Sequence, residues 1–341
     1  MKNSDTSAAT VSARNIVGAA SAAIPPHAAP TISAQHRRIF STLALSLLLA
    51  QLSACKTAPT HEPPPAANPN ACAGIPIIEV PATAERGSTT IRCITSYTGN
   101  TDLLNTLKLD SLLLVLDIDD TLLTSDTFFG SDRWYEWQTS KDIDPKDKVR
   151  CLFDVIALNY EAGTQHAVEG DAGSAFISKL KVPKLLLTSR SAHARGGTER
   201  ELLHAKYELP INLMPSNHGS SWINVRSGKP APISYANGIQ MVTGRDKGQS
   251  LLDLLTFLKL HYDNIVLVDD GEANITSLRQ ALPAAGINYY GFHYKGVDKS
   301  FDEDDKDQAR AAWGSWSELM EKRYPNRWVR WGEKDGTGCG R

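Results

Sequence analysis

The sequence predicts an α/β protein whose core is a doubly wound parallel β-sheet, with helices on both faces. Two observations lead to this class. Short, continuous apolar runs such as LLLVL at 112–116 have the length and composition of strands that are buried on both faces. Amphipathic helical segments alternate with these runs along the chain, as they do where helices connect parallel strands.

The composition of the 341-residue chain is that of a globular protein, with 41% hydrophobic and 22% charged residues. Its formal net charge of −2 gives no reason to expect a nucleic-acid partner. The histidines show no HExxH spacing and the cysteines no CxxC spacing, so a zinc site is not expected.

The N-terminal segment predicts export and a lipid anchor. Two arginines precede an apolar run at 39–52, which is too short to span a bilayer and is typical of a signal-peptide core. The residues LSAC that end at Cys55 resemble a bacterial lipobox, in which the cysteine is lipidated. We therefore expect a leader and lipoprotein signal peptide over 1–55 and a Pro-rich tether over 56–74.

The export route stays open between two interpretations of the long leader. Translation starts later than Met1, or RRIF at 37–40 is a twin-arginine signal. Lys56, which follows the cysteine in place of an aspartate, resembles lipoproteins that are sorted to the outer membrane. We expect an outer-membrane lipoprotein that faces the periplasm of a Gram-negative bacterium.

An oxidising periplasm permits disulfides among the cysteines that remain after processing. Cys72 and Cys93 are close in sequence, which favours this pair, although four cysteines allow three connectivities. The candidates are Cys72, Cys93, Cys151 and Cys339.

The predicted folded domain covers 75–341, and its elements follow in order. Apolar runs predict buried strands at 112–116, 184–188, 264–270 and 286–294. A Thr198/Glu201 capping box predicts the start of a helix over 198–209. Further helices are predicted at 248–262, with Leu251, Leu254, Leu255 and Leu258 on one face, and at 272–282.

About sixty residues separate the first two strands, too many for an ordinary crossover. Within them, 130–182 is predicted to form a small helical cap. Its aromatic residues Trp134, Tyr135 and Trp137 either form the core of the cap or stack on an aromatic group of a substrate. The C-terminal helix that contains Trp313 and Trp316 is expected to pack on the domain.

Polar residues follow the strands at the sheet edge where ligands bind in open parallel sheets. Carboxylates there suit a magnesium ion, and a hydroxyl and an ammonium suit phosphate oxygens. These residues are Asp117 and Asp119 after the first strand, Thr188 and Ser189 after the second, Asp269 and Asp270 after the third, and Lys247 at the start of the preceding helix.

This ordered set, which begins with D-x-D-x-T at 117–121, resembles the four motifs of the haloacid dehalogenase-like (HAD) superfamily. The stretches GSDRW, TSR, KGQSLLDLL and LVDDGEANI resemble a bacterial HAD-like family of unknown function, and DIDDT resembles secreted acid phosphatases. The resemblance implies a Rossmann-like HAD fold with the cap between the first two motifs.

The resemblance also implies a role for each residue. Asp117 is the expected nucleophile and Asp119 the general acid and base. Thr188, Ser189 and Lys247 are expected to bind the phosphoryl group. Magnesium is expected on Asp117, on the main-chain carbonyl of Asp119 and on the acidic pair; Asp270 is favoured over Asp269 as the direct ligand, but the choice stays open.

The expected function is therefore magnesium-dependent hydrolysis of small phosphomonoesters in the periplasm, through an aspartyl-phosphate. The alternative is a non-catalytic HAD-fold binding or envelope lipoprotein. A response-regulator receiver has its acidic pair first and its lysine last, and a dehalogenase does not need Asp119, so neither fits. Arg190 either contacts the substrate or caps the sheet edge at the surface.

Overall fold

The computed structural model describes residues 68, 70–149, 151–208, 220–224 and 231–323. The chain divides into two compact units, residues 1–62 and 63–341, and all the described residues belong to the second. The predicted signal peptide, Cys55 and most of the tether therefore lie outside the described residues. No helix in the described part of the chain is long and apolar enough to cross a membrane.

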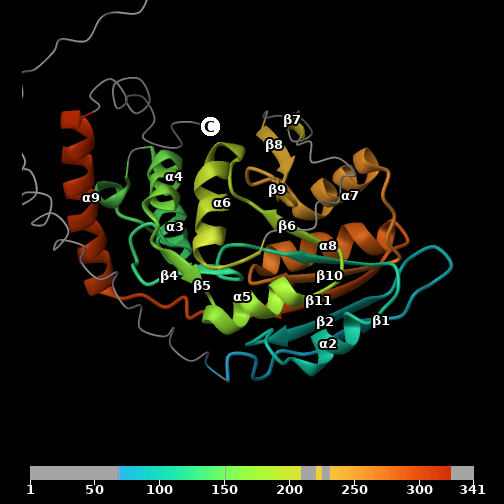
Figure 1. Ribbon diagram of the computed structural model, residues 1–341. Helices are drawn as coiled ribbons and strands as arrows, with labels where there is room; N and C mark the ends of the chain where they lie inside the picture. Colours follow the sequence, from blue (N-terminus) through green and yellow to red (C-terminus); the bar gives the residue numbers. More distant parts are fainter. Residues whose placement is uncertain (1–67, 69, 150, 209–219, 225–230, 324–341) are drawn as a thin grey trace, which may run out of the picture. The chain divides into compact units, whose positions relative to one another are not determined.

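The core is a mixed, mostly parallel sheet of nine strands among the described residues, in the order β1-β2-β11-β10-β3-β6-β9-β8-β7 (Figure 1). The six strands from β2 to β9 in this order are parallel to one another. The bounds are β1 Ile78–Val80, β2 Thr89–Ile94, β3 Leu112–Leu116, β6 Lys184–Thr188, β7 Ser220–Asn224, β8 Ala231–Ala236, β9 Ile239–Met241, β10 Asn264–Asp269 and β11 Asn288–Tyr294.

The prediction of a doubly wound α/β sheet is confirmed, and its wholly parallel character is corrected at the edges. Strand β1 pairs antiparallel with β2, and β8 pairs antiparallel with both β7 and β9. The central strands are buried at every position, which produces the apolar runs seen in the sequence. Edge strand β1 is short and mainly exposed, so it has no such run.

Side chains of β3 alternate between two apolar layers, as a strand covered on both faces requires. Leu113 and Val115 pack against α7 (Lys247–Leu258) and α8 (Glu272–Ala284). Leu112, Leu114 and Leu116 pack in the layer to which α2 (Thr101–Thr106), α5 (Gly170–Lys179) and α6 (Arg195–His204) contribute. The predicted helices at 248–262 and 272–282 correspond to α7 and α8.

The predicted start of the helix at Thr198 is wrong, because α6 begins at Arg195 after a 3-10 turn over Ala192–Ala194. Thr198 lies inside the helix and its Oγ1 donates to the carbonyl of Ala194 at 2.9 Å. The same oxygen accepts a hydrogen bond from Arg190 Nη1 at 3.1 Å. Thr198 is thus a partner of the site and not a helix cap.

The segment between β3 and β6 contains the predicted helical cap. Its elements are β4 Leu123–Ser125, α3 Asp132–Thr139, the 3-10 helix η1 Pro145–Asp147, α4 Leu152–Ala162, β5 Gln165–Ala167 and α5. Trp134 and Trp137 are buried in an apolar cluster of α3 and α4, so these two rings belong to the core of the cap. Trp313 and Trp316 of α9 (Glu303–Arg323) pack against the same cluster, which confirms that the C-terminal helix packs on the domain.

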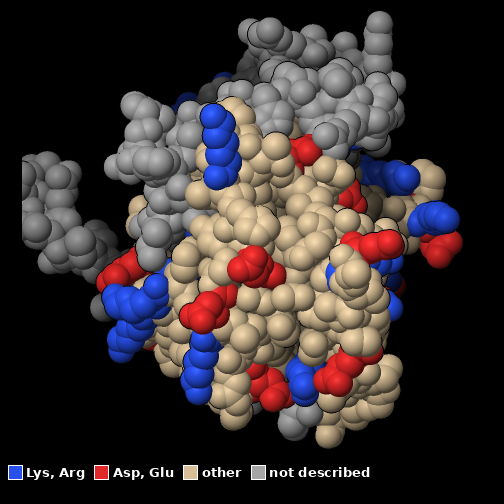
Figure 2. All heavy atoms as spheres, turned by 90° about the vertical axis from the view of Figure 1, so that its right-hand side faces the viewer, with Lys and Arg blue, Asp and Glu red and all other residues tan. Residues whose placement is uncertain are grey.

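Two further features concern the surface and the chain start. The predicted disulfide between Cys72 and Cys93 is present, and it joins the start of the described residues to β2. Figure 2 shows one face of the molecule, where the basic and acidic side chains of the described residues are scattered and mixed.

Candidate functional site

The carboxyl ends of three neighbouring strands meet at one edge of the sheet. In the sheet, β3 lies between β10 and β6, and Leu116 pairs with Val268 on one side and Leu186 on the other. The residues that end or follow these strands therefore lie side by side. They are Asp117, Thr188 and Asp269.

Lys247 joins two of these positions through buried ion pairs. It is the first residue of α7, its exposed fraction is 1%, and its Nζ lies 2.7 Å from Asp117 Oδ1 and 2.8 Å from Asp269 Oδ2. Burial alone would lower the pKa of Lys247, but the two carboxylates raise it above its ordinary value. The ammonium at this helix start, where the helix dipole disfavours a cation, is thus held by its partners.

The nucleophile candidate lies among more negative than positive charges. Burial raises the pKa of Asp117 well above its ordinary value, and Asp269 raises it further against the opposing effect of Lys247. Carboxylate oxygens of Asp117, Asp269 and Asp270 lie within 4.8 Å of one another. A crowded set of hard oxygen donors with excess negative charge fits a magnesium ion.

Asp269 and Asp270 differ in how many hydrogen bonds and ion pairs their carboxylate oxygens form with the rest of the protein. Asp269 Oδ1 accepts from the Gly271 amide and from Asn274 Nδ2, both at 2.9 Å, and Oδ2 is paired with Lys247. Asp270 Oδ2 is paired with Lys299 at 2.6 Å, whereas within the described part of the chain Asp270 Oδ1 has only a 3.5 Å contact with the Thr121 hydroxyl. Asp270 therefore has the freer oxygen for a metal, while Asp269 is a support for Lys247.

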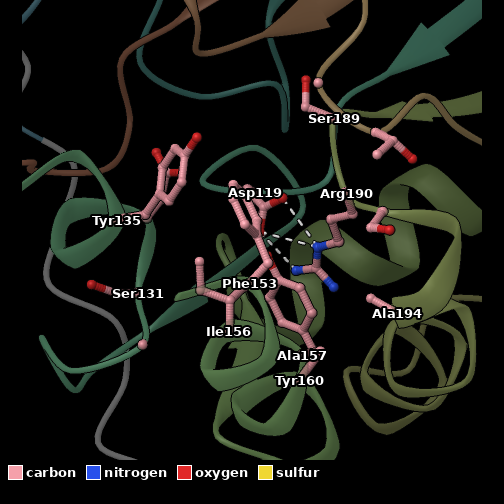
Figure 3. Close-up of a pocket in the computed structure, with 15 residues that line it drawn as sticks. Asp119, Ser131, Tyr135, Phe153, Ile156, Ala157, Tyr160, Ser189, Arg190 and Ala194 are labelled. Carbon is pink, nitrogen blue, oxygen red and sulfur yellow. Dashed lines mark hydrogen bonds and ion pairs between the residues drawn. The ribbon is translucent and has the colours of Figure 1, made fainter. Parts of the chain in front are cut away.

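The carboxylate of Asp119 is not part of this group of three acids and pairs with Arg190. Arg190 Nε lies 3.1 Å from Asp119 Oδ2 and Nη2 lies 2.7 Å from Oδ1 (Figure 3). The guanidinium also contacts Thr198 and Gln165 and stacks on the Tyr160 ring at 3.7 Å. Of the two alternatives for Arg190, a surface arginine is wrong, because this side chain is 1% exposed.

The two hydroxyl residues after β6 have different environments. Thr188 is fully buried, and its Oγ1 accepts a hydrogen bond from the amide of Arg190 at 3.1 Å, which leaves the hydroxyl proton available for another acceptor. Ser189 is exposed and lines a cavity next to Asp119. Only Thr188 is thus held in a fixed position by the fold.

Lys299 is a residue of the site that the sequence reasoning missed. It lies in the loop after β11, and its Nζ is 2.6 Å from Asp270 Oδ2 and 2.7 Å from Asp132 Oδ2 of α3. Asp120 and Glu136 complete this cluster, at 3.6 Å and 3.3 Å from the same nitrogen. No motif places Lys299 near the acids, so only the fold reveals it.

The acids around Lys299 are unusually weak. Burial, with a contribution from Asp132, raises the pKa of Asp120 to about 7. Burial also raises the pKa of Asp132 to about 6, although Lys299 opposes this shift. Part of this cluster therefore binds protons near neutral pH.

A cavity of about 160 Å³ opens beside Asp119, between the cap and the loops after β6 and β9 (Figure 3). Helices α3 and α4 form its cap side. Its lining residues are Asp119, Gly130, Ser131, Asp132, Tyr135, Phe153, Ile156, Ala157, Tyr160, Ser189, Arg190, Ser191, Ala194, Thr243 and Gly244.

The fold and the site define a capped α/β protein with a carboxylate–lysine centre at the carboxyl edge of its sheet. Residues 97–325 match the family described as "Protein of unknown function (DUF2608)". The match spans more than half of the chain, which therefore belongs to this family.

One solved structure with similarity to the chain is a conserved haloacid dehalogenase-like protein of unknown function from Agrobacterium tumefaciens. It is 16% identical, with 58% of this chain and 89% of that chain covered and a TM-score of 0.32. No curated protein matches the chain significantly.

Proposed function

We propose that the protein is a magnesium-dependent phosphomonoester hydrolase that acts through an aspartyl-phosphate on Asp117. The observation that supports this most strongly is the buried cluster in which Lys247 bridges Asp117 and Asp269 while Asp270 lies alongside. Asp119 lies at the mouth of a cavity next to this cluster. The motif resemblance supports the same chemistry.

The proposed reaction has two displacements. A carboxylate oxygen of Asp117 forms a bond to phosphorus as the bond to the substrate alcohol breaks, and Asp119 passes a proton to the leaving oxygen. Asp119 then takes a proton from a water molecule, which attacks phosphorus and releases Asp117 and inorganic phosphate. Arg190 positions the Asp119 carboxylate in both steps.

The other polar groups bind the phosphoryl group and neutralise its negative charge. Lys247 and the hydroxyl of Thr188 hold phosphoryl oxygens, and Ser189 supplies a further donor at the cavity. Magnesium would be held by Asp117, the main-chain carbonyl of Asp119 and Asp270, with Asp269 in support. When bound, it offsets the repulsion between the nucleophile and the phosphate.

Phosphate release from 4-nitrophenyl phosphate tests this proposal. The purified full-length chain should release phosphate with magnesium and lose this activity in excess chelator, and Asp117→Asn should be inactive under both conditions. A broad panel of phosphomonoesters without any magnesium-dependent release would contradict the proposal.

Beryllium fluoride distinguishes the hydrolase from a non-catalytic binding protein with the same fold. A nucleophilic aspartate should trap it as a mimic of the acyl phosphate, visible as a magnesium-dependent rise in melting temperature. Asp117→Asn is the matched control and should show no rise. A wild-type protein that also shows none would favour the binding protein.

We also propose that Cys55 is lipidated and that the protein faces the periplasm from the outer membrane. The support is the pattern of charged, apolar and small residues over 36–56. Metabolic labelling with a fatty acid should mark the wild type and not Cys55→Ser. Labelling that persists in the variant would contradict the anchor at this cysteine.

A further inference from the structure

The cavity beside Asp119 lies where the alcohol of a substrate has to go. If Asp117 attacks phosphorus, the leaving oxygen faces the residue that protonates it, which is Asp119. Asp119 and Ser189 line the cavity, whereas Asp117 and Lys247 do not. The cavity therefore includes the acid–base group and leaves out the nucleophile and Lys247.

The cap side of this cavity is mainly apolar and aromatic, with Ser131 and Asp132 as its polar members. Tyr135 comes from α3, and Phe153, Ile156, Ala157 and Tyr160 come from successive turns of α4. In Figure 3 these side chains lie around the Asp119–Arg190 pair. Such a wall gains more from contact with an apolar group than with a hydrated one.

The charged residues of the lining are already paired. Among the described residues that line the cavity, Arg190 is the sole cation, and it donates three hydrogen bonds to Asp119. Asp132 is paired with Lys299 at 2.7 Å. A second phosphate or a carboxylate on the alcohol would find no unpaired cation among the described lining residues, and its desolvation would oppose binding.

The size of the cavity limits the group that it can hold. An apolar cavity of about 150 Å³ accommodates a benzene-sized ligand. The cavity here has a volume of about 160 Å³, so one ring or an aliphatic group of similar size fills it. A nucleoside, with a ribose and a base, would extend beyond it through the open side of the cavity.

We propose that this cavity is the site of the leaving alcohol and selects phosphomonoesters whose alcohol is uncharged and bears one small apolar or aromatic group. The inference rests on the proposed function, since it assigns a substrate class to the same reaction. It makes Tyr135, Phe153 and Ala157 residues that determine specificity.

Binding of phosphonates, which are not hydrolysed, tests the inference without turnover. With magnesium present, calorimetry should show that benzylphosphonate binds about tenfold or more tightly than methylphosphonate, because the ring is buried. A carboxylate at the para position of the ring should remove this advantage. Equal affinities for the three phosphonates would overturn the inference.

Two leucine variants of the same helix provide the matched comparison. Ala157→Leu places added bulk in the cavity and should abolish the preference for the ring, while methylphosphonate still binds. Ala162 is exposed near the end of α4 and does not line the cavity, so Ala162→Leu should keep the preference. A preference that survives Ala157→Leu would place the ring elsewhere.

Hydrolysis separates this inference from the proposed function. Benzyl phosphate should exceed glycerol 2-phosphate and adenosine monophosphate by about tenfold in kcat/KM, and all three have alkyl leaving groups. Magnesium-dependent hydrolysis without this order would overturn the substrate class and leave the hydrolase intact. Ring-selective phosphonate binding without hydrolysis of any ester would refute the hydrolase and support the cavity as a ligand site.

Discussion

Asp117 and Asp119 lie two residues apart, yet each contacts a different cation. Asp117 pairs with Lys247 inside the carboxylate cluster, and Asp119 pairs with Arg190 at the cavity. In the proposed mechanism this division corresponds to separate roles, in which Asp117 attacks phosphorus and Asp119 moves protons. At the residue scale, the two should therefore fail in different ways when they are changed.

Asp117→Asn should leave no phosphoenzyme and no turnover, because the nucleophile is gone. Asp119→Asn should still bind magnesium, since its expected metal contact is the main-chain carbonyl, but should lose about a hundredfold or more in kcat. Calorimetry with magnesium and steady-state kinetics measure these effects.

The Asp119→Asn loss should be smallest for esters with good leaving groups, which need little protonation. A comparison of aryl with alkyl phosphates checks this dependence. Equal losses on both classes, together with a collapse of magnesium affinity, would show that the roles are assigned wrongly.

The Asp119–Arg190 pair also stabilises the fold, because Arg190 is buried with several partners. Arg190→Met should lower the free energy of unfolding by about 3 kcal/mol, since it leaves a largely enclosed carboxylate without its counter-charge. Asp119→Asn in the same background should restore part of this loss. Urea unfolding of the wild type, both single variants and the double variant measures the coupling, and additive losses would rule out a direct interaction.

At the scale of elements, Lys299 connects three parts of the chain. The loop after β11 carries it, α3 of the cap supplies Asp132 and Glu136, and the edge of the core supplies Asp120 and Asp270. The cap is thus tied to the core by charge beside the carboxylate cluster.

Lys299→Met should lower the free energy of unfolding in chelator by about 2 kcal/mol, a value reduced from that of a fully buried pair because the side chain is 28% exposed. Magnesium should stabilise the variant more than the wild type, since the acids lack another cation. Lys306→Met on α9 is the control and should change little. Equal stabilisation of both proteins by magnesium would contradict the role of Lys299 as counter-charge.

The sequence predicts the strands that are buried on both faces and misses the strands at the edges of the sheet. Leu112–Leu116 and Lys184–Thr188 coincide with their apolar runs, because central parallel strands are covered on both faces and are therefore mostly apolar. Edge strands such as Ile78–Val80 lack that requirement, so nothing in their composition marks them. Thr198 resembles a cap locally, and only its tertiary contact with Arg190 shows otherwise.

The residues of the candidate site also divide into those that the sequence predicts and those that it misses. Asp117, Lys247 and Asp269 were predicted because each lies at a strand end or helix start, and the topology brings such positions to one edge. Lys299 and the partners of Arg190 come from a loop and from the cap, whose positions depend on packing. Their approach to the acids has no counterpart in local sequence.

At the scale of the whole molecule, the weak acids near the site make stability depend on pH. The folded state raises the pKa of Asp120 to about 7 and of Asp132 to about 6, from 3.8. At pH values between 3.8 and these raised pKa values, the folded state binds more protons than the unfolded state. The free energy of unfolding therefore falls as pH rises through this range.

In chelator, the melting temperature should therefore be higher at pH 5 than at pH 8, by about 4 °C or more. Saturating magnesium should reduce the difference, because a bound cation takes over the role of the protons. Differential scanning calorimetry at both pH values measures this. A higher melting temperature at pH 8 in chelator would contradict the direction derived from these acids.

The disulfide between Cys72 and Cys93 also determines how the domain meets a mechanical pull. Tension that enters along the chain before Cys72 passes through the sulfur bridge directly into β2. The residues between the two cysteines, which include β1, then carry no tension. The force therefore acts on β2, which pairs with β11 over residues 89–94. It does not act on the short edge strand β1, which would otherwise separate from the sheet first. Reduction of the disulfide would move the point at which the force acts from β2, inside the sheet, to β1 at its edge.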